Sequence, residues 1–532
     1  KLMQKRKYLV PIFLMLITIG VLVGMKVNTA ASGDDVFDNV KKFNEALNLV
    51  QKNYVDEVNT DKLTEAAIKG MLDQLDPHST YITQDQLKRI NEDFQGSFEG
   101  IGVEFDIVND TITIVTPISG GPSEALGILA GDKIVKIDGV NAVGMTREDV
   151  PKKLRGPKGT KVTVAISRGG SPNLIDFEIT RDKIPLYSVD ASFMINNEVG
   201  YARVTRFSAT TYDEFAKALA EMKKQGMKKL VLDLRNNPGG YLDQAFKMAS
   251  MFIERGKKIV YTKSRIPAYN DEYISEGGEY TNIPLVVLVN DGSASASEIV
   301  SGAIQDWDRG IIVGENTFGK GLVQRQYDLS DGSAMRVTTS RYYTPSGRLI
   351  QKPYEGGEYK QMLINPEEGD NLYHNNDTKD TSRPEFKTMG GRTVYGGGGV
   401  TPDFVIRLDT LTDYSVQLRR VNLFLEFANA YYDANRENIK SSYSDYLKFR
   451  DNFTVTPNML EDFKSLAASK NIPFNEEQWQ RDLDFITTSI KSIIARDVWG
   501  NNGSMAVWLA TDKQFEKAMT LFPEAEKLAQ LR

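Results

Sequence analysis

Hydrophobic residues follow different spacings along the chain, and each spacing predicts a different kind of segment. An uncharged, Leu/Ile/Val-rich run covers residues 8–25. From residue 34 to 96 the apolar positions recur every three or four residues, the spacing of helices with one apolar face. The stripes are Phe43, Leu47, Leu49, Val50 and Tyr54, then Leu63, Ala67, Ile68, Met71 and Leu72. We therefore expect an N-terminal helical region, 34–96, with too small a core to stand alone.

Residues 97–185 instead alternate apolar and polar positions in short runs rich in β-branched residues, which predicts strands. The runs are Ile101–Phe105, Thr111–Val115, Lys133–Ile137, Lys161–Ile166 and Leu174–Ile179. Short helices are expected at Ser123–Leu126 and Thr146–Leu154. The segment predicts one compact, mostly β module.

Residues 186–408 alternate strand and helix, as in a sheet covered by helices, where functional groups gather at the strand ends. The predicted strands are Val199–Val204, Lys229–Leu234, Leu285–Val289 and Ile311–Val313. The predicted helices run from Thr211, in a capping box with Glu214, to Lys224, then over Leu242–Phe252 and Ser295–Trp307. A polar, Gly-rich loop is expected within 353–399. Helical stripes resume over 409–532, which we interpret as an accessory region of open role.

The amino-acid composition excludes several classes of functional site. The chain has 532 residues, enough for about three or four domains. It has no cysteine, which excludes disulfides, thiol catalysis and cysteine-bound metals. Its two histidines, His78 and His374, argue against a multi-histidine metal site or a histidine base. The net charge is −6, so the chain lacks the overall excess of positive charge that is typical of nucleic-acid-binding proteins. We expect neither a metal nor another cofactor.

The N-terminal run predicts a membrane segment. Lys1, Lys5, Arg6 and Lys7 precede residues 8–25, which as a helix would span about 27 Å, close to the hydrocarbon thickness. That is longer than the apolar part of most signal peptides, which favours an uncleaved anchor, although the small residues 29–32 would also suit cleavage. A buried core helix is the alternative. Because the positive flank stays in the cytoplasm, the body is expected outside the inner membrane, in the periplasm.

The segment Gly292–Glu298 is a candidate for nucleophilic chemistry. It follows a buried strand, is built of small residues and contains serines at the start of a predicted helix, where the helix dipole is positive. The structural alternative is an ordinary N-cap, since Ser295 and Glu298 have the spacing of a capping box. Both interpretations stay open at this point.

A serine nucleophile needs a base, and a buried lysine of lowered pKa can replace histidine. Lys320 is flanked by glycines and apolar residues, and Gln324, four residues on, could orient its amine. An exposed loop lysine is the alternative. The stretch Gly314–Lys320 also fits a phosphate-binding loop, but Gly321 stands where that motif needs Ser or Thr, and the following residues are β-like rather than helical.

Two glycine turns complete the set of candidates. Gly239 and Gly240 follow a buried strand, where their N–H groups could approach an oxyanion. The turn formed by Gly100, Ile101, Gly102 and Val103 could present N–H groups to a peptide carboxylate beside a strand edge. A plain tight turn explains either one alone.

Taken together, these motifs resemble the carboxyl-terminal processing (tail-specific) proteases. The resemblance rests on Arg235–Gly240, Gly292–Glu298 and Phe318–Gln324 behind the Gly100–Val103 module, with Leu75–Ser79 upstream and Gly397–Asp403 downstream. It covers about residues 35–405. It implies a multidomain α+β chain: an N-terminal helical segment, a PDZ domain at 97–185, and a crotonase/ClpP-like α/β protease core at 186–408. The C-terminal helical region, 409–532, lies outside it.

The resemblance also assigns roles. It implies Ser295 as the nucleophile, Lys320 as the general base and Gln324 as its orienting residue. The N–H of Ala296 and that of Gly239 or Gly240 would form the oxyanion hole. Residues 100–103 would bind the carboxylate of a substrate tail.

We therefore expect a periplasmic serine endopeptidase that recognises proteins by an apolar C-terminus. Its expected partners are protein or peptide substrates, the membrane if the N-terminal segment is uncleaved, and a second copy or an adaptor protein. A non-catalytic PDZ scaffold that binds tails is the competing function, and a nucleotide hydrolase is third.

Overall fold

The computed structural model describes residues 34–169, 172–354 and 383–530, and the chain divides into two compact units, 1–81 and 82–532. The predicted membrane segment, 8–25, lies outside the described residues. Within them, no helix is both long and apolar enough to cross a bilayer.

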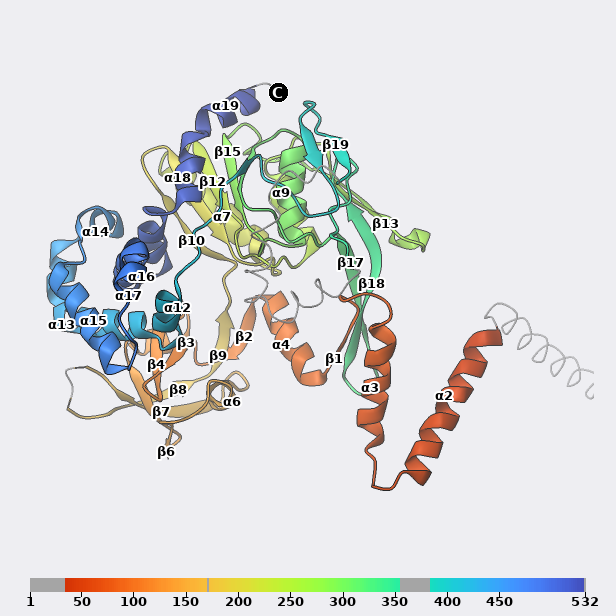
Figure 1. Cartoon of the computed structure of the whole chain (residues 1–532), viewed down its shortest axis with the longest axis horizontal. Coiled ribbons are helices and arrows are strands. Elements are labelled where there is room, and N and C mark those ends of the chain that lie inside the picture. Colours follow the sequence, from red (N-terminus) through yellow and green to blue (C-terminus); the bar gives the residue numbers. More distant parts are fainter. Residues whose placement is uncertain (1–33, 170–171, 355–382, 531–532) are drawn as a thin grey trace, which may run out of the picture. The chain divides into compact units, whose positions relative to one another are not determined.

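The first unit contains α2 (Asp34–Asn53) and α3 (Thr60–Leu72), and β1 (Thr80–Ile82) ends at its boundary (Figure 1). The two predicted stripes correspond to these helices. Asn59 caps α3 by accepting a hydrogen bond from the backbone N–H of Lys62. Side chains of α2 such as Phe37 and Leu49 are exposed. The helical assignment of this region is thus confirmed, with little core of its own.

The second unit starts with α4 (Gln84–Gln95). A capping box at Thr83 forms its N-terminus, and Gly96, in the left-handed conformation, ends it. A two-stranded stem of β2 (Ser97–Gly100) and β9 (Asp182–Pro185) follows. The stem leads into a sheet of order β3-β4-β5-β7-β8, with β6 paired to β5. Its elements are β3 (Val103–Val108), β4 (Thr111–Pro117), α5 (Pro122–Ala125), β5 (Lys133–Ile137), β6 (Val140–Asn141), α6 (Asp149–Leu154), β7 (Lys161–Ser167) and β8 (Ile175–Thr180). This mostly β module has its own apolar core of isoleucines and valines, as the alternating runs predict.

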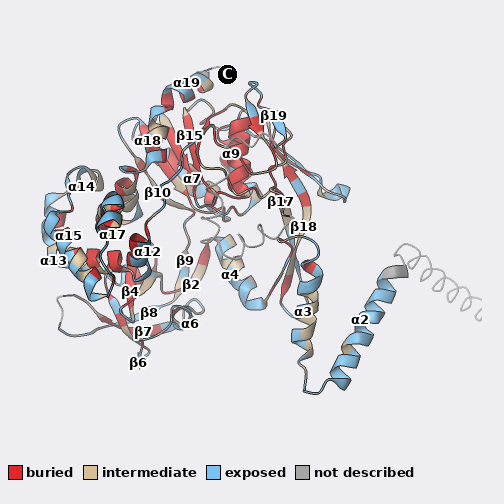
Figure 2. Ribbon diagram, viewed as in Figure 1, coloured by how far each residue is buried: buried red, intermediate tan, exposed pale blue. Residues whose placement is uncertain are grey.

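The core of the second unit is a six-stranded sheet of order β10-β11-β12-β15-β16-β21, parallel from β11 onward. Its strands are β10 (Val189–Met194), β11 (Val199–Val204), β12 (Lys229–Asp233), β15 (Leu285–Val289), β16 (Ile311–Gly314) and β21 (Phe404–Val405). Three helices cover one face: α7 (Thr211–Lys224), α8 (Leu242–Ser250) and α9 (Ala296–Asp306). Figure 2 shows these strands and α9 as the most continuously buried part of the molecule.

The predicted capping box at Thr211 is wrong. Thr210 is the N-cap of α7 and its hydroxyl donates to Glu214 at 2.6 Å. The Thr211 hydroxyl turns inward and donates to the Ser188 hydroxyl at 2.7 Å. The reason is burial, because the inward position next to Ser188 and Ser208 satisfies a threonine that would otherwise lie unpaired in the core.

A second, mostly antiparallel sheet borders the core. It joins β13 (Lys258–Lys263), β14 (Glu272–Ile274), β17 (Leu322–Asp328) and β18 (Ala334–Tyr343). The short η1 (Pro267–Tyr269) lies between β13 and β14, and β19 (Glu385–Lys387) pairs with β20 (Thr393–Tyr395). Since β17 begins at Leu322, just after Lys320 and Gly321, the helix that a phosphate-binding loop needs is absent from this position.

Helices form the remainder of the chain, as the stripes over 409–532 predict. They are α12 (Asp413–Arg420), α13 (Leu423–Ser442), α14 (Tyr446–Asn452), α15 (Pro457–Ser469), α16 (Glu476–Arg481), α17 (Leu483–Leu509), α18 (Lys513–Thr520) and α19 (Phe522–Gln530). Most of them share an aromatic-rich core. The end of α17 with α18 and α19 packs instead on the face of the central sheet opposite α9. These last helices therefore form the third layer of the core, which the sequence analysis did not foresee.

Candidate active site

The candidate residues gather where three neighbouring parallel strands end. The turn 235–240 follows β12, the turn 290–295 follows β15, and the loop 315–321 follows β16. Because β12, β15 and β16 are adjacent and parallel, their carboxyl ends meet at one edge of the sheet. Segments far apart in sequence are thereby brought together.

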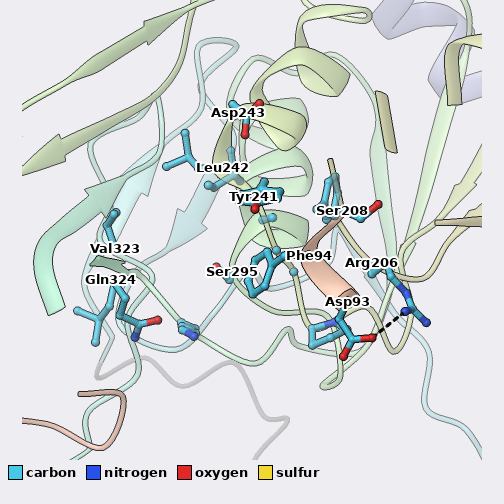
Figure 3. A pocket seen from close by; sticks show the side chains of 18 of the residues that line it. Asp93, Phe94, Arg206, Ser208, Tyr241, Leu242, Asp243, Ser295, Val323 and Gln324 are labelled. Carbon is cyan, nitrogen blue, oxygen red and sulfur yellow. Dashed lines mark ion pairs between the residues drawn. The ribbon is translucent and has the colours of Figure 1, made fainter. Parts of the chain in front are cut away.

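A cavity of about 1220 Å³ lies at this edge. Its lining includes all six residues expected to take part in catalysis: Ser295, Ala296, Lys320, Gln324, Gly239 and Gly240. Figure 3 shows Ser295 near the centre of the cavity, with Gln324 on one side and Arg206 on the other. The loop at Gly100–Val103 lies outside this lining, on the β module.

Ser295 lies in a strained turn. Its φ is +54° and its ψ is −107°, a conformation that costs a non-glycine residue of the order of 1–3 kcal/mol. The turn holds because its neighbours are fixed: the Ala294 N–H donates to the Asn237 carbonyl at 2.9 Å, and the Ser293 hydroxyl donates to the Leu234 carbonyl at 2.8 Å. The half-buried Ser295 side chain thus stands at the start of α9, where the helix dipole favours developing negative charge.

The buried carboxylate of Glu298 joins the serine turn to the lysine loop. One of its oxygens accepts hydrogen bonds from the backbone N–H groups of Ser295, at 2.8 Å, and Lys320, at 2.9 Å. The other oxygen accepts from the Thr317 hydroxyl, at 2.6 Å, and the Gly319 N–H, at 2.7 Å. Burial raises the pKa of Glu298, and these four hydrogen bonds oppose that rise. The carboxylate reaches back to Ser295 as in a capping box, and it also fixes the backbone of the candidate base.

Tyr342, from β18, joins the same two segments on their carbonyl side. Its buried hydroxyl lies 3.0 Å from the Ser295 carbonyl oxygen and 2.5 Å from the Lys320 carbonyl oxygen. The pattern of the sequence singled out neither this tyrosine nor the bridging role of Glu298. Together the two side chains hold the backbones of Ser295 and Lys320 in one position.

The structure distinguishes the two candidate glycines. The N–H of Gly239 donates to the side-chain oxygen of Asn237 at 2.9 Å. A Cβ on Gly239 would lie 2.9 Å from the Cβ of Ser295, so only glycine fits beside the serine. The N–H of Gly240 takes part in no hydrogen bond among the described residues. The backbone N–H of Gly240 is therefore the one available to donate to an oxyanion.

Gln324 is half-buried in the cavity wall. Its side-chain Nε2 is buried and lacks a hydrogen-bond partner within the described part of the chain. A buried amide without a protein partner costs free energy unless water or a ligand pairs with it. The Gln324 amide thus lies in the same cavity as Lys320 and is available for a hydrogen bond.

The rest of the cavity wall combines an aromatic pair with several cations. The rings of Phe94, on α4, and Tyr241 have centroids 4.8 Å apart. Arg206 pairs with Asp93 at 3.7 Å, while burial lowers the pKa of Arg336. An extended peptide could lie between this wall and Ser295.

The carboxylate-binding candidate forms a tight turn at the start of the edge strand β3. Gly102 has a φ of +76°, and its carbonyl accepts from the N–H of Ile118 at 2.9 Å. The Ile101 carbonyl accepts from both the N–H and the hydroxyl of Ser123, at 3.1 and 2.6 Å. With one carbonyl fixed toward Ile118 and the other toward α5, the peptide groups of the turn are held in one orientation. Among the described strands β3 pairs only with β4, and near its end the Ile107 carbonyl accepts from the Asn422 side chain at 3.3 Å.

Four family models match separate stretches of the chain. Residues 198–357 match the model of peptidase family S41, and residues 113–168 match a PDZ domain. Residues 23–86 match the N-terminal domain of the activating protease CtpB, and residues 414–500 match a family of unknown function, DUF8443.

Individual relatives give the same result. The carboxy-terminal processing protease CtpA of Bacillus subtilis is 40% identical over 332 residues, which cover 62% of this chain and 70% of the relative. A carboxy-terminal-processing protease of Bartonella bacilliformis is 38% identical over 328 residues, 61% of this chain and 75% of the relative. A solved structure of a photosystem II D1 C-terminal processing protease is 31% identical, covers 70% of this chain and 93% of that chain, and has a TM-score of 0.36.

Proposed function

Because the chain belongs to the carboxy-terminal processing proteases of peptidase family S41, we propose that it is an endopeptidase with a Ser–Lys mechanism that selects proteins by an apolar C-terminal tail. One observation carries the catalytic part of the proposal. Ser295, at a strained turn, shares a single cavity with Lys320, Gln324 and the candidate oxyanion donors. Among the described residues, no histidine lines that cavity.

The proposed reaction uses only side chains and amides of this chain. The neutral amine of Lys320 takes the hydroxyl proton of Ser295 as the serine oxygen attacks the substrate carbonyl. The N–H groups of Ala296 and Gly240 hold the resulting oxyanion. The Lys320 ammonium then donates its proton to the leaving amine, and water releases the acyl group by the reverse sequence. Gln324, whose amide is uncommitted, orients the lysine.

Tail recognition is assigned to the PDZ domain. A substrate C-terminus would add as a strand along β3, with its carboxylate at the turn of Gly100, Ile101, Gly102 and Val103. The position of β3 at the end of the strand order and the fixed carbonyls of the turn support this assignment. An apolar final side chain suits a site beside the Ile- and Val-rich core of the domain.

We also propose that the enzyme works outside the inner membrane, in the periplasm, held there by residues 8–25. Substrates are then proteins or peptides of that compartment, and the N-terminal helices are available to a second copy or an adaptor. The support for the location is the charge pattern of the first 25 residues.

The test compares the wild-type chain with Ser295→Ala and Lys320→Ala. Each is incubated with an unstructured protein ending in apolar residues and with the same protein ending in charged residues, and the fragments are identified by mass. We expect cleavage by the wild type alone, faster on the apolar tail. A Lys320→Ala variant with wild-type activity would refute the base. Binding of the apolar tail without cleavage by the wild type would favour the scaffold alternative.

A further inference from the structure

The turn that carries Gly239 and Gly240 begins with a buried arginine whose second partner comes from the C-terminal helices. Arg235 donates to the carboxylate of Asp233, at 2.6 Å from Nη2 and 3.0 Å from Nε. Its remaining amino group, Nη1, pairs with Asp512 Oδ2 at 2.6 Å and donates to Gln514 Oε1 at 3.0 Å. The guanidinium is thus held between two carboxylates and one amide.

Each partner of Arg235 is itself fixed. Asp512 is the N-cap of α18: its Oδ1 accepts from the N–H groups of Gln514, at 2.9 Å, and Phe515, at 3.0 Å, which leaves Oδ2 for the arginine. Gln514 is fully buried and donates through Nε2 to the Ile406 carbonyl at 2.8 Å. Asp512 is therefore already fixed at the start of α18 when it pairs with Arg235. The ion pair differs in this respect from one between two flexible surface side chains.

The opposite charges of this cluster stabilise one another within the protein interior. Burial acts to raise the pKa of Asp233, but the charge and hydrogen bonds of Arg235 hold that pKa below its ordinary value. Burial likewise opposes the charge of Arg235, and the carboxylates of Asp233 and Asp512 keep the pKa of its guanidinium well above the ordinary value. Removing the Asp512 carboxylate would leave Asp233 as the carboxylate partner of this buried arginine.

Arg235 is joined directly to the glycine turn, so a shift of its backbone would pass into that turn. The next residue, Asn236, has a φ of +56° and is held by the side chain of Asn290 at 2.8 Å, and Asn237 accepts the Gly239 N–H. Because Gly239 packs against the Cβ of Ser295, a small rotation of the turn would change the distance from its amides to the reacting carbonyl.

We propose that Asp512 is a positioning residue for the oxyanion hole, so that the C-terminal helices are part of the catalytic unit. Asp512 acts through Arg235 and touches no reacting atom. The proposal rests on the proposed function for the reaction that it serves. It concerns a segment, residues 501–532, that lies outside the four family matches.

The experiment uses the full chain and four variants. Asp512→Asn keeps an N-capping side chain but removes the charge that faces Arg235. Asp512→Ser also keeps a cap and is too short to reach the arginine. Asp512→Glu restores the charge. Asp409→Asn is the matched control, because Asp409 pairs with Lys513 on the same helix start but is exposed.

Three quantities are measured: kcat and KM on the apolar-tailed protein, the affinity of a peptide aldehyde that forms a tetrahedral adduct with Ser295, and amide hydrogen exchange over residues 235–241. For Asp512→Asn and Asp512→Ser we expect kcat to fall at least tenfold with KM within twofold. Aldehyde affinity should fall by a similar factor, and exchange at the glycine turn should be faster. Asp512→Glu should recover part of kcat, and Asp409→Asn should behave as the wild type.

Unchanged kcat, or a fall in kcat with unchanged aldehyde affinity, would overturn the proposal. Failure of the proposed function is seen separately, as no cleavage by the wild type or as cleavage by Ser295→Ala. In that case hydrogen exchange still decides whether Asp512 holds the turn: equal exchange in the wild type and in Asp512→Asn would refute it.

Discussion

Replacing Glu298 by glutamine removes the link between the serine turn and the lysine loop with almost no change in shape. All four groups around the carboxylate are used as donors, and the Thr317 hydroxyl already accepts from the Val400 N–H at 2.7 Å. A carboxylate satisfies four donors, whereas an amide offers one oxygen and one NH₂ group. At least two of the four hydrogen bonds must therefore be lost, and two donors then face an NH₂.

The magnitude follows from the number and kind of these bonds. A hydrogen bond to a charged group contributes about 1.5–3 kcal/mol, so two lost bonds correspond to about 3–6 kcal/mol. The neutral amide avoids the cost of burying a charge, which is the reason that burial raises the pKa of Glu298. We expect the free energy of unfolding to fall by about 2–4 kcal/mol after this offset. Because the backbones of Ser295 and Lys320 lose a shared anchor, kcat should fall about tenfold to hundredfold.

Urea unfolding measures the first quantity, and turnover of the apolar-tailed protein measures the second, at a urea-free condition where the variant is fully folded. Glu221→Gln serves as the control, since Glu221 is exposed on α7 and its ion pair with Lys224 is long, at 3.9 Å. It should change stability by less than about 0.5 kcal/mol. A Glu298→Gln enzyme that is destabilised but retains wild-type kcat would refute the link, and one with unchanged stability would refute the hydrogen-bond count.

Three further outcomes are expected. Tyr342→Phe removes the hydroxyl between the Ser295 and Lys320 carbonyls, and should lower kcat several-fold at a stability cost of about 1 kcal/mol, measured by turnover and urea unfolding. Burial raises the pKa of Asp497 to about 7, from 3.8 in the unfolded chain. The wild type should therefore lose stability as the pH rises from about 4 to 7, and Asp497→Asn should raise stability at pH 8 by up to about 4 kcal/mol, seen by thermal unfolding at pH 5 and 8; a variant no more stable than the wild type at pH 8 would contradict this. Gly102→Ala, at a φ of +76° with a Cβ 3.0 Å from an Ile184 methyl, should weaken binding of an apolar tail peptide while leaving cleavage of an untailed peptide unchanged.

Local patterns predicted the elements that carry the site. The strand Val199–Val204 has the bounds expected from its spacing, and α9 begins one residue after the predicted start at Ser295. These assignments succeed because a buried strand followed by small residues and a helix leaves few alternatives. The order of the segments then places their ends together, since neighbouring parallel strands end on one edge of a sheet.

Contacts between distant segments could not be predicted in this way. Tyr342 follows Ser295 by 47 residues and reaches it only because β18 folds back along β17. Glu298 has a local role that its spacing reveals, as a cap, and that role gives no sign of its contacts with Thr317 and Gly319. The misplaced capping box at Thr211 has the same origin, because burial rather than spacing decided which threonine took the N-cap position.

The C-terminal helices are separate in sequence from the PDZ domain and from the glycine turn, but they contact both of these parts. Leu425 packs with Val108 and Val115 of the PDZ domain, and Ile493 of α17 packs against that cluster. The same α17 continues past a kink at Gly500 to the sheet face. α18 follows it, and its capping residue holds the arginine of the oxyanion turn. One set of helices therefore contacts the proposed tail-binding domain at one end and the proposed oxyanion hole at the other. Since one contact is apolar packing and the other is an ion pair between the buried Arg235 and the N-cap of α18, the PDZ domain and the glycine turn are held by a common body.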